Sequence, residues 1–356
     1  MCAICGIFIP SGIDDQVVHQ VIQMRDAMTH RGPDDAGIYH DADMALGVRR
    51  LSIIDVAGGH QPISNEDGTV WVVSNGEIYN FKELRQELES KGHHFRTRSD
   101  TEVIVHLYEE DGDQFVKQLR GMFGLALWDK RNRRLLLARD RMGIKPLYYA
   151  ARGETLLFAS ELKALQSHPE IRPLLDLKSM DQYLFLGYVP APRSILQDVL
   201  KLPPGHFLVV EKGRRELFPY WRLPAAPPRA EISEKEASAR VEEAVLESVR
   251  VHLESDVPVG IFLSGGLDSS LILWAMRQHH SGEIPAFTIG FEESSFDEAT
   301  FAAEAASACR AKLTTKVFRS EDLLNSIEDV ARASDEPMGT LPSFQHGCFP
   351  AWPAHR

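Results

Sequence analysis

The first residue that could do chemistry is a cysteine placed directly after the initial methionine, in the run MCAICGIF at residues 1–8. Cysteine is small enough for a methionine aminopeptidase to remove Met1, which would leave Cys2 with a thiol and a free α-amine. A model α-amine titrates at about 7.7–8.0 and a thiol at about 8.5, so the amine can serve as a local base for its own nucleophile. The alternative is that Cys2 only begins a buried strand, because free cysteine is often buried.

Groups that could bind a charged small molecule occur in two further stretches. Arg49 and Arg50 interrupt an otherwise apolar run. An arginine there is either a charge at the rim of a sheet or a carboxylate clamp, since its planar fork binds carboxylates bidentately. Asn75 and Gly76 end an expected strand at residues 70–74, just before a helix start. Asn-Gly is a strong hairpin signal, yet an Asn amide and a glycine N–H can also stabilise a developing oxyanion.

A third candidate is the glycine- and serine-rich turn SGGLDSS at residues 264–270, between a buried strand and an apolar helix. Such a turn can bind an anion, because glycines let backbone N–H groups approach a phosphate and the helix dipole favours negative charge. No lysine follows the glycines, so this is not the GxxxxGK[ST] loop. A turn without a ligand is the alternative. Asp268 is a plausible magnesium ligand, directly or through water.

The elements that must position these residues differ between the two halves of the chain. The first half alternates short apolar strands with turns and a few helices, which predicts an α+β layered structure. The second half has βαβα order, which predicts a doubly wound parallel sheet with its ligand at the carboxyl ends of the strands. The expected strands of the second half lie at residues 257–263, 285–289 and 312–318.

Composition limits the classes of protein that the chain can represent. Its 356 residues favour two domains, and its net charge of -12 argues against a nucleic-acid partner. The four cysteines are too few for a disulfide scaffold. We find no signal peptide and no apolar run long enough to span a membrane, so we expect a soluble protein of the reducing cytoplasm. A homodimer is compatible with the sequence, which leaves the oligomeric state open.

Six motifs of the first half, taken in order, resemble the class II glutamine amidotransferase domain of glutamine-dependent asparagine synthetases. The resemblance implies a four-layer αββα sandwich of the N-terminal-nucleophile (Ntn) type, with L-glutamine bound between the sheets. The motifs are Cys2 with Gly6-Ile7, RGPDD (31–35), RRLSIID (49–55), NGEIYN (75–80), SDTEV (99–103) and DRMGIKPLYY (140–149).

The resemblance also implies a role for each matching residue. Cys2 would attack the side-chain amide of glutamine, with Asn75 and Gly76 as the oxyanion hole. One cation would meet the substrate carboxylate and two anions its ammonium group. Ala3 is a departure, because the family usually has glycine there and an extra methyl could disturb the nucleophile. The implied glutamine-binding residues are Arg50 (the carboxylate clamp), Glu77 and Asp100 (the ammonium partners), together with Leu51, Ile54, Asn75 and Gly76.

The turn SGGLDSS resembles the pyrophosphate loop of ATP pyrophosphatases, which split ATP to AMP and pyrophosphate while adenylating a carboxylate. Mg²⁺ is implied with ATP and would be held by Asp268, and the Ile289 backbone would meet the adenine. The implied ATP-binding residues are Leu263, Ser264, Gly265, Gly266, Leu267, Asp268, Ser269, Ser270 and Ile289.

We therefore predict four segments: a glutamine amidotransferase domain at 2–215, a linker at 216–232, the N-terminal part of an ATP-binding domain at 233–340, and an atypical tail at 341–356. The resemblance ends after residues 335–337, and the second glycine- and acid-rich loop of the synthetases has no counterpart, so we expect an incomplete sheet in a truncated domain. A zinc role for His346, Cys348 and His355 in the tail has an incomplete ligand set.

The leading functional hypothesis is an asparagine synthetase-type reaction. Cys2 would release ammonia from L-glutamine, Mg-ATP would activate L-aspartate as β-aspartyl-AMP, and ammonia would attack that intermediate. The alternatives are a glutaminase half with an inert second domain, a related amidotransferase acting on another carboxylate, and a non-catalytic binding module. The presence of Cys2 disfavours the β-lactam-forming relatives, which often lose it.

Overall fold

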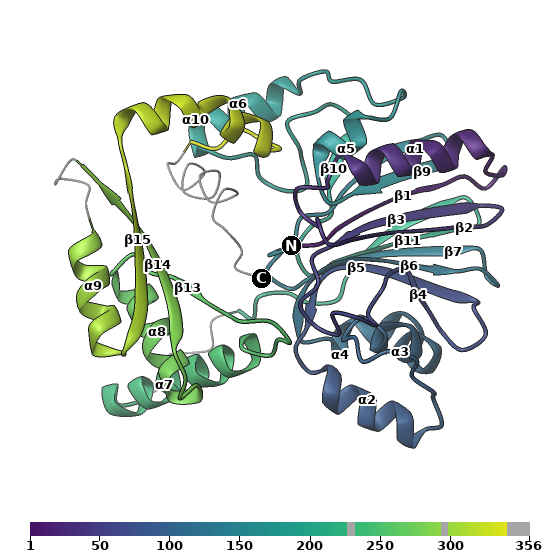
Figure 1. The fold of residues 1–356 in the computed structure, drawn as a ribbon. Coiled ribbons are helices and arrows are strands. Elements are labelled where there is room, and N and C mark those ends of the chain that lie inside the picture. Colours follow the sequence, from purple (N-terminus) through teal and green to yellow (C-terminus); the bar gives the residue numbers. More distant parts are fainter. Residues whose placement is uncertain (226–231, 293–297, 340–356) are drawn as a thin grey trace. The chain divides into compact units, whose positions relative to one another are not determined.

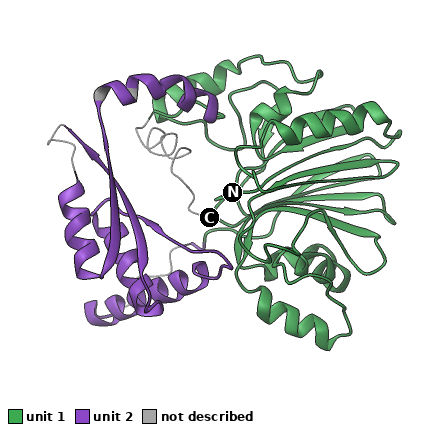
Figure 2. Cartoon of the chain, viewed as in Figure 1, with its two compact units in different colours: residues 1–223, 335–339 green, residues 224–334, 340–356 purple. Residues whose placement is uncertain are grey.

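The computed structural model describes residues 1–225, 232–292 and 298–339 of the chain (Figure 1). It divides into two compact units: unit 1 holds residues 1–223 and 335–339, and unit 2 begins at Pro224 (Figure 2). The predicted end of the first domain at residue 215 falls within strand β12 (Arg214–Pro219). The division after Leu223 therefore leaves that strand with the sheet to which it is hydrogen-bonded.

The first sheet of unit 1 has the strand order β10-β8-β9-β1-β3-β2, and every neighbouring pair is antiparallel. Strand β1 is central, with Cys5 opposite Gly47 on β3 and Ala159 on β9. The start of the chain is thus fixed from both sides. The strands are β1 (Ala3–Phe8), β2 (Asp35–His40), β3 (Met44–Arg50), β8 (Tyr148–Arg152), β9 (Thr155–Ala159) and β10 (Val199–Lys201).

The second sheet has the antiparallel order β12-β11-β7-β6-β5-β4. Strand β5 continues through Asn75 and Gly76, which lie opposite Gly124 and Phe123 of β6. The expectation that the strand ends at Ser74 is wrong, because these polar residues still pair with a neighbouring strand. The remaining strands are β4 (Ile63–Ser64), β5 (Val70–Ile78), β6 (Gly121–Asp129), β7 (Arg134–Arg139) and β11 (His206–Glu211).

Three clusters of buried side chains separate the layers of unit 1. One lies between the two sheets and includes Ile4 and Trp128. A second joins the first sheet to its helices, and a third joins the second sheet to the other helices. The order is therefore helix, sheet, sheet, helix, which confirms the predicted αββα sandwich (Figure 1). The helices are α1 (Asp15–Asp26), α5 (Leu162–Gln166) and α6 (Leu177–Leu186) on one side, and α2 (Phe81–Ser90), α3 (Val103–Asp111) and α4 (Phe115–Gln118), with the 3₁₀ turn η1 (Gly112–Gln114), on the other.

Unit 2 contains a parallel sheet of order β13-β14-β15, as predicted for an incomplete α/β domain. Its buried cluster includes Val249, Leu273 and Ala302, from three different helices. Within the described residues, the order of the strands across this sheet follows their order in the chain. The elements are α7 (Glu234–His252), β13 (Ile261–Phe262), α8 (Leu267–His279), β14 (Ile284–Phe291), α9 (Ala299–Ala308), β15 (Ala311–Phe318) and α10 (Ser320–Ala333). No helix in the described ranges is both long and apolar enough to cross a membrane.

The segment after α10 returns to unit 1. Oδ2 of Asp335 accepts a hydrogen bond of 2.7 Å from the backbone N–H of Leu162, at the start of α5. Glu336 pairs with Lys201 and accepts a hydrogen bond of 2.9 Å from the backbone of Ile195. Residues 335–339 therefore belong to the first unit although they follow the second in the chain. His346, Cys348 and His355, whose ligand set is incomplete for zinc, lie outside the described residues.

Candidate active site

The backbone around Cys2 is held by a partly buried arginine. Nε of Arg31 donates to the Cys2 carbonyl at 3.1 Å, and the Met1 amine donates to the Arg31 carbonyl at 2.9 Å. Arg31 is in turn paired with Glu161 at 3.0 Å. Burial opposes ionisation of Glu161, but His30, Arg31 and Lys163 outweigh it and hold the pKa of this carboxyl at about 2. Glu161, which stays ionised, therefore fixes Arg31, and Arg31 in turn fixes the backbone of Cys2.

The Cys2 side chain faces the space between the sheets. Alternation along an extended chain puts it on the same side as Ile4, which is wholly buried there. Its Sγ lies 3.6 Å from the Leu51 carbonyl oxygen. Burial raises the pKa of the thiol, and Arg50 acts in the opposite direction. Ala3 points the other way, and its methyl packs under the helices of the first sheet, so the departure at residue 3 is accommodated in the core.

Asn75 and Gly76 reach the same region from the second sheet. Asn75 is wholly buried, and its Nδ2 lies 3.5 Å from Oγ of Ser160. That oxygen also accepts a hydrogen bond of 3.0 Å from the backbone of Ile4, so Ser160 joins Asn75 to β1. Gly76 has φ +154°, and a Cβ there would lie 1.9 Å from the Met122 carbonyl oxygen. Only glycine fits this bend of β5.

Arg50 is 4% exposed and organises the loop that follows β3. It donates to the carbonyls of Ile54 and Asp55, both at 2.8 Å, and to that of Val56 at 3.3 Å. These bonds use three of the five N–H groups of a guanidinium, which leaves two for another acceptor. Of the predicted apolar contacts, Leu51 meets the thiol through its carbonyl, and Ile54 packs against the helical side of the second sheet.

Asp100 and Glu77 are two acids close enough for the charge of Glu77 to act on Asp100. Asp100 is buried, and its Oδ2 accepts a hydrogen bond of 2.7 Å from the backbone of Ile78. Burial, reinforced by the charge of Glu77, raises the pKa of Asp100 to about 6. Burial also raises the pKa of Glu77. Two neighbouring acids whose ionisation is disfavoured in this way favour a cation beside them.

Sequence reasoning missed three residues of this region. Ser160 ends an apolar strand and carries no motif. Glu161 follows it and shows its role only through Arg31. Lys145 lies within the motif DRMGIKPLYY but had no role assigned; it is buried, and its Nζ lies 3.4 Å from Sδ of Met1. Burial lowers the pKa of Lys145, while Glu77 raises it. The one sequence feature that could have indicated these three residues is a polar side chain close to the end of a buried strand.

The second candidate site is the turn between β13 and α8 in unit 2. The Ser264 and Ser269 hydroxyls are 3.0 Å apart, and Gly266, which precedes α8, donates to Ser264 Oγ at 3.3 Å. Gly265 has φ +78°, and a Cβ there would meet the Ala302 backbone nitrogen at 2.5 Å. Leu267, Asp268 and most of the turn are exposed, so the helix N-terminus is open to solvent.

The predicted adenine contact lies at the same edge of the sheet as this turn. Leu263 donates a backbone hydrogen bond of 2.8 Å to Phe287 on β14, and Ile289 follows two residues later. The predicted ATP-binding residues are thereby brought together at the carboxyl ends of β13 and β14. This is where a parallel α/β sheet binds its ligand.

Comparison with known proteins agrees with the division of the chain into two units. Residues 1–221 match the family model of the glutamine amidotransferase domain, and residues 240–347 match that of asparagine synthase. The chain is thus an amidotransferase domain joined to part of an asparagine synthase domain. It belongs to the glutamine-hydrolysing asparagine synthetase family.

Three relatives illustrate the range of the family. Asparagine synthetase [glutamine-hydrolyzing] 1 of Bacillus subtilis is 39% identical over 95% of this chain and 53% of its own length. A putative asparagine synthetase [glutamine-hydrolyzing] 2 of Methanocaldococcus jannaschii is 33% identical over 97% of this chain and 70% of its own. Amidase chry2 of Gibberella zeae is 33% identical over 93% and 52%. The chain thus spans about half the length of the Bacillus and Gibberella relatives.

Proposed function

We propose that unit 1 hydrolyses L-glutamine to L-glutamate and ammonia, with Cys2 as the nucleophile. The observation that carries the proposal is the proximity of one thiol, one buried arginine and two acids, whose charges act on one another. Cys2 lies against Leu51, beside the loop that Arg50 holds, and the charges of Arg50 and Asp100 both act on its thiol. Such a set of charges suits an α-amino acid.

The chemistry begins when Met1 is removed. The free α-amine of Cys2 takes the thiol proton, and the thiolate attacks the side-chain amide carbon of glutamine. Nδ2 of Asn75 and the backbone N–H of Gly76 stabilise the oxyanion of the tetrahedral intermediate. The amine then protonates the departing nitrogen, which leaves as ammonia. Water hydrolyses the resulting γ-glutamyl thioester and regenerates the thiol.

The α-carboxylate and the ammonium group of glutamine would each bind to side chains of the opposite charge. The two N–H groups that Arg50 does not use on its loop would bind the α-carboxylate. Asp100 and Glu77 would bind the ammonium group. That cation would lower the pKa of both acids, which burial raises in the free protein, with the charge of Glu77 adding to the effect on Asp100. Binding would therefore relieve a repulsion that folding imposes.

We propose that unit 2 belongs to the synthetase half of the reaction. ATP would place its phosphates at the N-terminus of α8, against Gly266 and the Ser264 and Ser269 hydroxyls. Mg²⁺, bound with ATP, would neutralise phosphate charge, and Asp268 is the acid of this turn that would hold it. The names of the relatives support L-aspartate as the acceptor. Its activated carboxyl group would combine with ammonia to give asparagine and AMP.

The proposed setting is the reducing cytoplasm, which keeps the Cys2 thiol available. The described helices include no candidate membrane span, and the charge of -12 opposes binding to nucleic acid. A homodimer stays a prediction.

Ammonia release from glutamine without ATP tests the first unit. Cys2→Ala should lower turnover by at least about 10³-fold, because no other group can form the thioester. Cys5→Ala, which removes a buried thiol on the strand that follows Cys2, should remain active. Equal losses in both variants would overturn the assignment of Cys2. Intact mass measurement reports whether Met1 is removed.

A separate assay tests the second unit. Pyrophosphate formation from Mg-ATP should depend on L-aspartate and should survive Cys2→Ala when ammonium replaces glutamine. Pyrophosphate formed equally well with another carboxylate would identify a different acceptor. No pyrophosphate with any acceptor, alongside normal glutamine hydrolysis, would leave the glutaminase activity as the function of the chain.

A further inference from the structure

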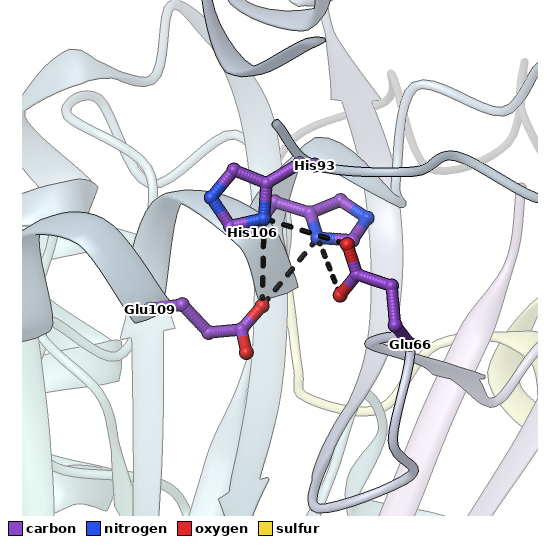
Figure 3. Close-up of side chains that lie close together, drawn as sticks. All are labelled: Glu66, His93, His106 and Glu109. Atoms are coloured by element: carbon purple, nitrogen blue, oxygen red, sulfur yellow. Dashed lines mark ion pairs between the residues drawn. The ribbon is translucent and has the colours of Figure 1, made fainter. Parts of the chain in front are cut away.

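We infer that unit 1 contains a second site, a tetrahedral Zn²⁺ site formed by Glu66, His93, His106 and Glu109. Figure 3 shows the two imidazole rings and the two carboxylates converging. Glu66 lies in the turn between β4 and β5, His93 in the loop after α2, and His106 and Glu109 on α3. The four residues come from three separate parts of the domain. None of them is among the proposed active-site residues.

The distances between the ligand atoms match the size of a zinc ion. Nδ1 of His93 lies 3.5 Å from a Glu66 oxygen and 3.8 Å from Oε2 of Glu109. Nδ1 of His106 lies 3.4 Å and 3.5 Å from oxygens of the same two acids. One ligand atom from each residue can be chosen so that all four lie within 4.8 Å of one another. In a tetrahedral zinc site with bonds of about 2.0–2.2 Å, ligand atoms are about 3.3–3.6 Å apart.

His106 supplies an independent reason to expect a ligand. Its side chain is 0% exposed, and neither ring nitrogen makes a hydrogen bond within the described part of the chain. A buried polar group in this state is costly, and such groups are rare in folded proteins. Its Nδ1 faces the carboxylates of Glu66 and Glu109 at distances too long for good hydrogen bonds (Figure 3). A metal ion among them would satisfy this nitrogen.

The surroundings fix the four side chains as a metal site requires. Metal-binding histidines usually direct their second nitrogen at a carboxylate. Nε2 of His93 lies 3.2 Å from Glu110, and Nε2 of His106 lies 3.8 Å from buried Glu102. The second oxygen of Glu109 is also held, by a hydrogen bond of 2.8 Å from Asn65. That bond leaves Oε2 of Glu109 directed at the two imidazoles.

A proton on His106 is the competing explanation for the cluster. Burial opposes that proton, but the neighbouring glutamates outweigh it and raise the pKa of His106 to about 9. In the metal-free protein an imidazolium would therefore balance part of the negative charge. Zinc binding would displace the proton. With four protein ligands the site is closed, which is typical of structural zinc. It would tie α3, and hence the segment carrying Asp100, to the β4–β5 turn.

The test compares two adjacent histidines in the full-length chain. Protein stripped with EDTA is titrated with Co²⁺, whose visible absorption reports tetrahedral coordination, and with Zn²⁺ against a chelator. The wild type should take up one ion at this site, and His93→Asn should weaken the uptake by at least about 100-fold, since loss of even an outer partner costs 10–100-fold. His94→Asn should bind as the wild type does, because His94 is exposed and its side chain is not a ligand. Donors elsewhere in the chain are the same in both variants.

Stability provides a second measurement. Zn²⁺ should raise the unfolding temperature of the stripped wild type and of His94→Asn, but not that of His93→Asn. If His93→Asn folds poorly, Glu109→Gln takes its place, because it keeps the shape of the side chain. Zn²⁺ should not raise the unfolding temperature of Glu109→Gln either. Equal binding in His93→Asn and His94→Asn, or no binding by the wild type at micromolar free Zn²⁺, would assign the cluster to a protonated His106 instead.

Discussion

The two candidate substrate sites of this chain are built in opposite ways. The amino-acid site of unit 1 draws buried charged groups from several strands and loops, and burial shifts the pKa of the Cys2 thiol and of Asp100. The anion site of unit 2 is a single run of seven residues, 264–270, largely exposed to solvent. The first therefore depends on the whole sandwich, whereas the second depends on one strand, one turn and the start of one helix.

The two sites would therefore recognise their ligands differently, one through fixed side-chain charges and the other through backbone N–H groups. A small zwitterion must be met at both ends by fixed charges, which requires a closed and preorganised frame. A phosphate can be bound by N–H groups that any helix start supplies, provided that the chain can bend tightly before it. Substitutions should therefore affect the sites unequally, and an assay for each unit can measure that inequality.

The largest effect is expected at Gly76. An alanine there would have to adopt φ +154°, which residues other than glycine rarely adopt. Its Cβ would also lie 1.9 Å from the Met122 carbonyl oxygen. We expect Gly76→Ala to lower the free energy of unfolding of unit 1 by about 3–5 kcal/mol, from the sum of backbone and packing strain. Urea unfolding measures it. Gly68→Ala is the control, because φ is +71° and nothing lies within 4 Å of its added Cβ; its cost should be about 1 kcal/mol. Equal costs would refute the tight approach of β5 to β6.

Asn75 comes next, because it acts on the reaction rather than on the fold. Removal of one oxyanion donor costs about 10²–10³ in kcat. Asn75→Ala should therefore reduce kcat for glutamine hydrolysis by that factor, with KM little changed. Steady-state kinetics on the full chain measures both constants, and ammonium-dependent pyrophosphate formation serves as the internal control. A rise in KM at constant kcat would make Asn75 a binding residue instead.

The comparison also explains what the sequence could predict. The anion turn is contiguous, so SGGLDSS and its flanking strand and helix were predicted from local pattern alone. The α+β arrangement of the first half followed from its short apolar strands. Assignment of Cys2, Arg50 and Asp100 to one site needed the resemblance, because no local pattern relates residues so far apart in the chain.

The parts that were not predicted share a physical origin. Ser160 is important only because β9 lies beside β1, and Glu161 only because Arg31 reaches it. The continuation of β5 through Asn75 and Gly76 is decided by pairing with β6, which overrides the local tendency of Asn-Gly to turn. The proposed zinc ligands Glu66 and His93 meet those of α3 only in the folded domain. Each depends on a long-range contact that no window of sequence contains.

Asp100 should reveal a conflict between stability and binding. Its pKa is raised from 3.8 to about 6, so the stability it contributes is complete below pH 3.8 and is lost as the pH rises through 6. Asp100→Asn should therefore increase the free energy of unfolding of unit 1 by about 3 kcal/mol at pH 8, and change it little at pH 3.5. The KM for glutamine should rise about 10–100-fold, because a hydrogen bond to a charged group is lost. Urea unfolding at both pH values, with KM measured at pH 8, tests these expectations. An equal change in stability at the two pH values would contradict the pKa of Asp100.

The smallest effect is expected in the exposed turn of unit 2. The Ser269 hydroxyl lies 3.0 Å from that of Ser264 and donates to the Gly266 carbonyl at 3.2 Å. Ser269→Ala removes these bonds but leaves the backbone N–H groups that we expect to bind phosphate. Net loss of one hydrogen bond costs about 0.5–1.5 kcal/mol, so the affinity for ATP should fall about 2–10-fold. Glutamine hydrolysis by the same protein should not change, since the amidotransferase chemistry uses none of these atoms. A loss of ATP affinity above 100-fold would mean that the hydroxyl, and not the backbone, carries the anion site, and the contrast between the two units would disappear.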